Sequence, residues 1–129
     1  MSLIKLQVKT ANHKYPIFIG SNILNKLKVI LKENLINFNQ CLVIADKNVP
    51  KKLIDKVLNA LPQKQISLHY FNSSEKNKNQ KSINNILSIL LSKNFNRNDC
   101  VISIGGGITG DVSGFAASIF KRGLKFINI

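Results

Sequence analysis

The sequence predicts an α/β fold in which an N-terminal pair of strands precedes a mostly parallel sheet. Residues 3–9 and 15–20 read as two short strands joined by the polar connection TANHK, which is typical of a hairpin. From about residue 40, apolar runs of strand length alternate with segments of helical periodicity. Such alternation favours strand–helix repeats whose parallel strands are covered on both faces.

The N-terminal strand pair is expected to be half buried. Its first strand places apolar residues from Ile4 to Val8 on one face at a period of two. A helix capped by Ser21 or Asn22 is expected to follow and to run to about Glu33. The buried stripe of this helix is expected to consist of Ile23, Leu27, Ile30 and Leu31.

Three strand–helix repeats and a last strand account for the remainder. CLVIA and CVISI are continuous apolar runs, the pattern of strands buried on both faces. The strands are expected at residues 41–45, 65–71, 100–104 and 125–129. The helices are expected to begin at Pro50, at about residue 79 and at the glycines after residue 104.

The segment IGGGITGD at 104–111 is the strongest candidate for a binding site. Gly105, Gly107 and Gly110 satisfy G-x-G-x-x-G between a predicted strand and a predicted helix, which is the context that this motif requires. A helix N-terminus offers free N–H groups and partial positive charge, and glycines let a diphosphate approach the backbone. A tight turn that only allows close helix packing is the alternative, and the spacing leaves both interpretations open.

The charge is strongly basic, at +13 with 19 basic and six acidic residues. Only Arg97 and Arg122 are arginines, and the lysines are spread along the chain with few aromatic residues among them. This pattern favours a solvated lysine surface over a nucleic-acid face.

Cysteine and histidine usage argues against a metal site within the chain. Cys41 and Cys100 each open a buried strand and are expected to be reduced, and His13 and His69 each stand alone. There is no signal-peptide pattern and no apolar run of membrane-spanning length, so we expect a cytoplasmic protein that does not bind a membrane.

The glycines belong to a longer block with a recognisable pattern. GGGITGDVSGFAASIFKRGLKFINI closely resembles the 3-dehydroquinate synthase segment GGGVVGDxxGFxAxxxxRGxxxxxxP. SEKNK at 74–78 resembles the G-E-x-x-K element of that family, and IADKNV at 44–49 resembles its D-x-N turn. The resemblance extends over essentially all 129 residues.

The resemblance implies a fold, a reaction and cofactors. In this family an N-terminal Rossmann-like domain binds NAD, and a mainly helical C-terminal domain binds zinc or cobalt. We therefore expect residues 1–129 to form the NAD-binding domain, incomplete at its C-terminal end and without the metal-binding domain. The implied reaction converts 3-deoxy-D-arabino-heptulosonate 7-phosphate to 3-dehydroquinate with release of phosphate, in the shikimate pathway that leads to chorismate and aromatic amino acids. This chain alone is expected to be inactive.

The resemblance also assigns site residues. Arg122 is expected to bind the phosphorylated seven-carbon sugar acid, because a guanidinium binds phosphate or carboxylate through two hydrogen bonds. No catalytic or metal-binding residue is expected within the chain. Ser74 and Asn79 depart from the family pattern, which has glycine and Ser or Thr there. The expected cofactor-binding residues are Asp46, Asn48, Glu75, Lys78, Gly106, Gly107, Ile108, Thr109, Gly110 and Asp111.

Three alternatives remain open. Another sugar phosphate cyclase would share the fold and the cofactor. A metal-dependent alcohol dehydrogenase of the glycerol dehydrogenase type would share the architecture and a G-G-G-x-x-x-D bend. A basic nucleic-acid-binding module would explain the charge and would bind arbitrary DNA in a salt-sensitive way. A homodimer is possible for a full-length enzyme of the family.

Overall fold

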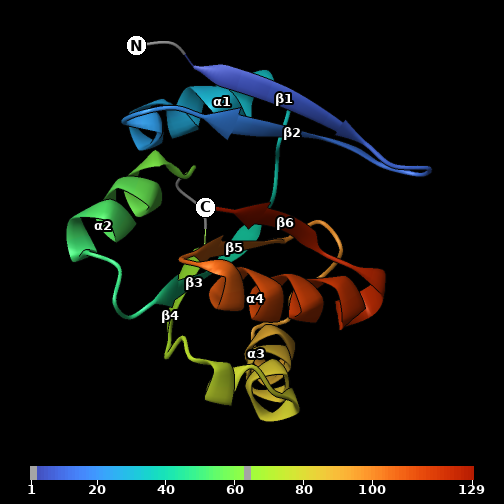
Figure 1. Cartoon of the computed structure of the whole chain (residues 1–129). Helices are drawn as coiled ribbons and strands as arrows, with labels where there is room; N and C mark the ends of the chain where they lie inside the picture. Colours follow the sequence, from blue (N-terminus) through green and yellow to red (C-terminus); the bar gives the residue numbers. More distant parts are fainter. Residues whose placement is uncertain (1–2, 63–64) are drawn as a thin grey trace.

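A hairpin and a four-stranded parallel sheet flanked by helices make up the structure (Figure 1). It is a computed structural model that describes residues 3–62 and 65–129. The predicted strand pair and parallel sheet are confirmed. The elements in chain order are β1 (Ile4–Lys9), β2 (Lys14–Ile19), the 3-10 turn η1 (Ile23–Lys26), α1 (Leu27–Glu33), β3 (Gln40–Asp46), α2 (Lys51–Ala60), β4 (Gln65–Phe71), the 3-10 turn η2 (Glu75–Asn77), α3 (Gln80–Ser92), β5 (Cys100–Ile104), α4 (Gly107–Ile119), the 3-10 turn η3 (Phe120–Arg122) and β6 (Lys125–Asn128).

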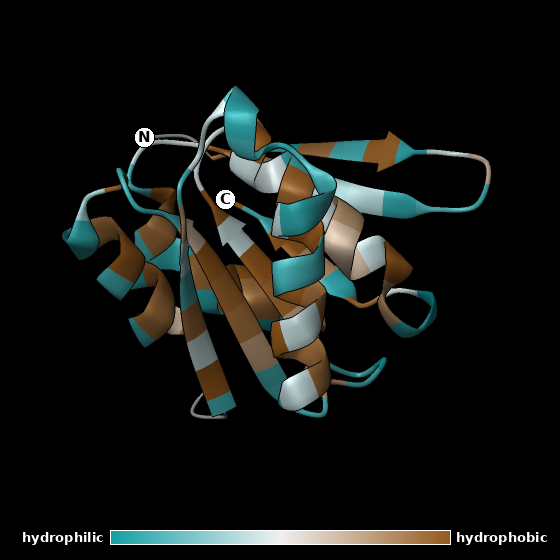
Figure 2. Ribbon diagram, turned by 90° about the horizontal axis from the view of Figure 1, so that it is seen from below, coloured by the Kyte–Doolittle hydropathy of each residue, from teal (hydrophilic) through white to brown (hydrophobic). Residues whose placement is uncertain are grey.

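The parallel sheet has the strand order β4-β3-β5-β6 and two separate apolar layers. One layer packs α3 and α4 against one face of the sheet, with Leu42, Ile44 and Val101 from the strands. The other packs α1 and α2 against the opposite face, with Val43 and Ile102. All five residues of β5 are buried, as the continuous apolar run CVISI predicts. Hydrophobic residues dominate the middle of the parallel sheet (Figure 2).

Helical spacing in the sequence predicts a buried stripe that includes Ile54 and Val57 in α2, and one that includes Ile86 and Leu90 in α3. The structure confirms both stripes. Ile54 and Val57 of α2 are almost fully buried, as are Ile86 and Leu90 of α3. Burial of a side chain of this size stabilises the fold by about 1.5–3 kcal/mol. Among the described residues, no helix is long and apolar enough to cross a membrane.

The hairpin corrects one expectation. The sequence predicts that the apolar face of β1 is buried. This is wrong for most of that face, because the Ile4 and Leu6 side chains remain 50% and 49% exposed. Strands β1 and β2 pair only with each other and form a sheet separate from the four parallel strands (Figure 1). Alternation therefore predicts which face of β1 is apolar. Within the described chain, no further strand pairs with the hairpin.

The helix starts differ from the expected caps at one place. The segment after β2 begins with η1, and only then does α1 run to Glu33. The N-cap of α1 is Lys26, so neither Ser21 nor Asn22 caps this helix. Asn22 precedes η1 with φ 54° and makes no side-chain capping hydrogen bond. By contrast, Asn79 caps α3 by accepting a hydrogen bond from the backbone N–H of Ser82 at 2.9 Å.

A buried carboxylate joins the amino-terminal ends of β3 and β5. Asp99 is 0% exposed, and its carboxylate accepts hydrogen bonds from the backbone N–H groups of Gln40 (3.1 Å) and Asn96 (2.7 Å). The side-chain amide of Gln40 donates a third hydrogen bond, at 3.2 Å. This network fixes the positions at which the two central strands begin.

Replacing Asp99 with alanine is expected to lower the free energy of unfolding by about 2 kcal/mol, because it leaves buried N–H groups without an acceptor. Urea denaturation measures the change. Asp55→Ala is the matched control, because its carboxylate pairs with Lys51 at the surface and should matter less. Equal effects of the two substitutions would contradict the structural role given to Asp99.

Candidate functional site

The strand order creates a switch point between β3 and β5. From β3 the chain passes through α2 to β4 on one side, and then through α3 to β5 on the other side. Helices α2 and α3 cover opposite faces of the sheet. In open α/β sheets a ligand crevice forms beyond the carboxyl ends of the two strands at such a point. Asp46 ends β3 and Gly105 follows β5, so both lie at the switch point.

Gly105 is a glycine because of its surroundings within the chain. Its φ is +154°, which a residue with a side chain rarely adopts. A Cβ at this position would lie 2.9 Å from Cβ of Asp46 and 3.1 Å from Oγ1 of Thr109. Its N–H donates to the carbonyl of Ile129 at 3.0 Å. The packing interpretation is therefore correct for Gly105.

Close packing within the chain also explains why residues 110 and 114 are glycines. A Cβ on Gly110 would lie 2.9 Å from the side-chain amide of Asn128, and one on Gly114 would lie 3.0 Å from the ring of Phe126. The smooth face of α4 thus lets the helix approach β6 closely. The sequence prediction did not include Asn128, which ends the last strand beside the glycine segment.

Gly106 and Gly107 differ from these three glycines. Both are exposed, and a Cβ on either would meet nothing within 4 Å. Gly106 has ordinary extended φ and ψ, and Gly107 is the first helical residue of α4. Neither packing within the chain nor backbone conformation requires glycine here. The space above them is open to a ligand.

The start of α4 offers backbone donors to this space. Gly106 is the N-cap and makes no side-chain capping bond, so the N–H groups of Gly107, Ile108 and Thr109 have no partner within the helix. The Gly110 N–H is already bonded to the Gly106 carbonyl at 3.1 Å. Beneath this turn, the fully buried Oγ1 of Thr109 has no hydrogen-bond partner among the described residues. The three free N–H groups can bind an anion.

Asp46 and Asn48 lie in the turn after β3. The Asp46 carboxylate accepts a hydrogen bond from the backbone N–H of Asn48 at 2.9 Å, which shapes the turn. This contact is the structural role that a turn acid would have without any ligand. The Asn48 side chain is exposed at the carboxyl edge of the sheet, where it is free to meet a ligand.

Lys78 and Asp111 connect the loop after β4 to α4. The Lys78 ammonium lies 3.0 Å from the Asp111 carboxylate, and both side chains are largely exposed. The hydrogen bond to Asp111, and then the charge of Asp111, raise the pKa of Lys78 above its ordinary value. The pair borders a surface groove of about 310 Å³ whose apolar wall includes Ile83, Val112 and Phe115. The structure thus brings together two predicted site residues that are 33 positions apart.

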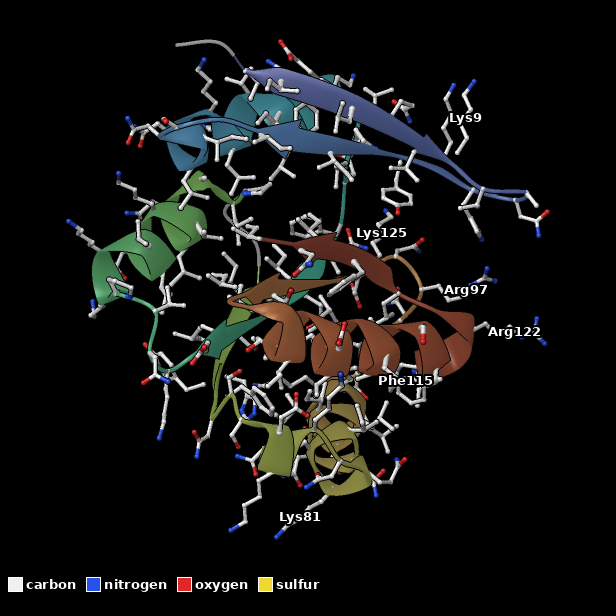
Figure 3. All side chains as sticks on the ribbon, in the orientation of Figure 1. Lys9, Lys81, Arg97, Phe115, Arg122 and Lys125 are labelled. Atoms are coloured by element: carbon white, nitrogen blue, oxygen red, sulfur yellow. The ribbon has the colours of Figure 1, made fainter. Side chains whose placement is uncertain are left out.

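Lys78→Gln is expected to weaken NAD binding about tenfold, because the charge-assisted hydrogen bond expected from the Lys78 ammonium to NAD is lost. Stability should change little, since the ion pair is exposed. Titration with NAD and urea denaturation measure the two effects. Lys81→Gln removes an exposed lysine of α3 outside the pair and should leave NAD binding unchanged (Figure 3). Indistinguishable behaviour of the two variants would rule out a specific role for Lys78.

Ser74 poses no backbone problem where the family pattern has glycine. Its φ of −158° is extended, so the position does not require glycine. Glu75 begins η2 and is exposed, and its charge contributes in a minor way to the raised pKa of Lys78.

Arg122 lies far from the other predicted site residues. It follows α4 at the end opposite to the glycines, and its side chain points into solvent (Figure 3). The helix rises by about 1.5 Å per residue over its 13 residues, so roughly 20 Å separate its two ends. The structure therefore does not bring Arg122 to the glycine bend of the same chain. Arg122 and Lys121 both have positive φ, at 70° and 43°.

Comparison with known proteins agrees with this architecture. Residues 68–129 match the family described as 3-dehydroquinate synthase N-terminal. The 3-dehydroquinate synthase of Pelagibacter ubique (strain HTCC1062) is 67% identical over 129 residues, which are 100% of this chain and 35% of that protein. The enzyme of Legionella pneumophila (strain Lens) is 31% identical over 125 residues, or 97% of this chain and 33% of that protein.

A solved structure shares the fold. The 2-deoxy-scyllo-inosose synthase complexed with carbaglucose-6-phosphate, NAD+ and Co2+ superposes with a TM-score of 0.85 at 22% identity. The match covers 98% of this chain and 35% of that one.

Fold and strand order thus define a doubly wound α/β domain with a switch point between β3 and β5. The comparisons confirm that this chain resembles the N-terminal part of 3-dehydroquinate synthase. The chain spans about a third of the length of the curated relatives that it matches.

Proposed function

We propose that this chain supplies the NAD-binding part of a 3-dehydroquinate synthase. The observation that carries the proposal is the pair Gly106 and Gly107, which need not be glycine for any reason within the chain. They open α4 at the switch point of the sheet, where a dinucleotide diphosphate would require close approach to the backbone. The identity to 3-dehydroquinate synthases over the whole chain supports the choice of enzyme.

The described residues fit the cofactor. The free N–H groups of Gly107, Ile108 and Thr109 would bind the diphosphate, with Gly106 and Gly110 completing the bend. The space over Gly106 and Gly107 gives the ligand room.

Side chains around the bend would hold the nucleoside parts. Asp46 and Asn48 offer a carboxylate and an amide to ribose hydroxyls or adenine edges, and Glu75 and Lys78 lie on the neighbouring loop. Asp111 would orient the nicotinamide end, and its carboxylate pairs with the Lys78 ammonium at 3.0 Å. NAD bound here would supply a hydride acceptor for the substrate. The role of this chain is to bind and orient the cofactor, not to perform the subsequent bond-making steps.

The described residues do not fit a metal site. They contain no group of three or more His, Cys, Asp or Glu side chains that could hold a metal ion. We therefore derive no step through zinc or cobalt from this chain. In the proposed enzyme the metal ligands come from the two-thirds of the relatives' length that has no counterpart here.

The proposal includes a substrate, a location and an assembly. The substrate is 3-deoxy-D-arabino-heptulosonate 7-phosphate, and the product is 3-dehydroquinate. We propose Arg122 as a substrate-binding residue from the family resemblance alone. The location is cytoplasmic and the complete enzyme is a homodimer, both following from the proposed membership of this family.

Three other functions are less well supported. Another sugar phosphate cyclase, such as the 2-deoxy-scyllo-inosose synthase of the same fold, is 22% identical, against 67% for the synthase of Pelagibacter ubique. The same comparison disfavours an alcohol dehydrogenase. A nucleic-acid-binding module would use the charge of +13 and predicts DNA binding that falls steeply with salt.

Titration of the purified chain with NAD tests the proposal. We expect saturable NAD binding that ADP-ribose competes away, and no phosphate release from the sugar phosphate substrate in the presence of NAD and zinc. A folded chain that binds DNA but not NAD would overturn the proposal. Phosphate release at rates near those of a full-length enzyme would contradict the expectation that the chain is inactive alone.

A further inference from the structure

Two cysteines lie side by side beneath the helices on one face of the sheet. Cys41 of β3 and Cys100 of β5 are direct partners in the parallel register. Both are free thiols, and both are 0% exposed. They belong to the same apolar layer, between the sheet and the helices α1 and α2. The proposed NAD site makes no use of them.

The register places the two thiols within reach of each other. Directly opposed residues on neighbouring strands point to the same face, and such strands lie about 4.8 Å apart. Disulfides join residues whose Cα atoms lie roughly 4.4–6.8 Å apart, so the backbone spacing is already suitable. The neighbouring Cys100 thiol, and then burial, raise the pKa of Cys41 far above its ordinary value.

We propose that Cys41 and Cys100 are a redox pair that closes to a disulfide joining β3 to β5. The oxidant is a low-molecular-weight disulfide such as oxidised glutathione. One cysteine thiolate attacks a sulfur of the oxidant, which breaks the S–S bond and releases one small thiol. The second cysteine thiolate then displaces the other small thiol and forms the protein disulfide. The two S–H bonds lose two protons and two electrons in all, and the oxidant is reduced to two thiols.

Closure of the pair is expected to be slow and reversible. The thiolate is the reactive form, and the environment of Cys41 disfavours it. Access requires local opening of the layer that α1 and α2 cover. A bond between adjacent strands of a rigid sheet must fit the existing strand spacing, and strained disulfides are readily reduced.

The bond would tie together the amino-terminal ends of the two strands at the switch point. Cys41 is five residues from Asp46, or about 16 Å along an extended strand, so closure leaves the glycine bend free. The redox proposal is therefore independent of the proposed NAD binding, and either can fail without the other.

Incubation of the full 129-residue chain with oxidised glutathione at mildly alkaline pH tests the proposal. We expect a monomer that has lost two hydrogen atoms, a Cys41–Cys100 peptide pair in a non-reducing digest, and full recovery of both thiols with dithiothreitol. Cys41→Ser and Cys100→Ser each remove one partner, so they can form only a mixed disulfide or an intermolecular dimer. Retention of the native circular dichroism during the reaction identifies closure in the folded state.

A parallel reaction in urea shows that the reagent can oxidise the chain. If the bond forms only in urea, while the folded protein keeps two alkylatable thiols, the proposal is wrong. It is equally wrong if the folded protein yields only mixed disulfides with glutathione.

Discussion

Gly107→Val is expected to weaken NAD binding about tenfold or more without unfolding the protein. A Cβ at this position meets nothing within 4 Å in the chain, so the added methyl groups would project into the space proposed for the ligand. The free energy of unfolding should change by less than about 1 kcal/mol, because the new side chain meets no atom of the chain and valine is no worse a helix former than glycine. NAD titration and urea denaturation of the same samples measure the two quantities.

Ser118→Val is the control for Gly107→Val. It places the same side chain at an exposed position near the other end of α4, away from the glycine bend. Its NAD affinity should equal that of the unchanged protein. If Gly107→Val binds NAD as tightly as Ser118→Val does, the open space over the glycines is not the cofactor site.

Gly105→Val is expected to have the opposite profile and to lower the free energy of unfolding by about 3 kcal/mol. Valine at φ +154° is strained, which contributes about 1–3 kcal/mol. The new side chain would also press on Asp46, since a Cβ at residue 105 lies 2.9 Å from Cβ of Asp46. Overpacking of this kind costs about 1–3 kcal/mol.

Gly106→Val is the matched comparison for Gly105→Val. The two positions are adjacent, but a Cβ at residue 106 is unobstructed and its φ is negative. Urea midpoints should therefore fall strongly for the first variant and little for the second. Equal loss of stability at both positions would show that the bend as a whole, and not Gly105 alone, is held by packing.

Apolar runs and helical spacing in the sequence predict much of the fold. The range predicted for β5, from Cys100 to Ile104, agrees with the structure because a continuous apolar run fits a strand covered on both faces. The stripes of α2 and α3 were predictable from helical spacing. The burial of β1 was not, because alternation identifies which face is apolar but not whether anything covers it.

The candidate site was predictable only in part. Spacing identified the glycines but could not separate Gly105, which packing requires, from Gly107, which it does not. That distinction depends on β3 and β5 being neighbours in the sheet, which brings Asp46 close to Gly105. No local sequence pattern predicts this strand order. Arg122 shows the same limit, because a position 11 residues after Asp111 along the chain lies beyond the far end of α4.

Phosphate release by a chimeric enzyme gives the most direct test of the proposed role. In the chimera, this chain replaces the matching 35% of the Pelagibacter ubique 3-dehydroquinate synthase. We predict that the chimera releases phosphate from 3-deoxy-D-arabino-heptulosonate 7-phosphate in an NAD-dependent reaction, and that Gly107→Val within it abolishes most of this activity. A folded chimera that releases no phosphate, while the parent enzyme does so under the same conditions, would contradict the assignment of this chain as the NAD-binding part of a 3-dehydroquinate synthase.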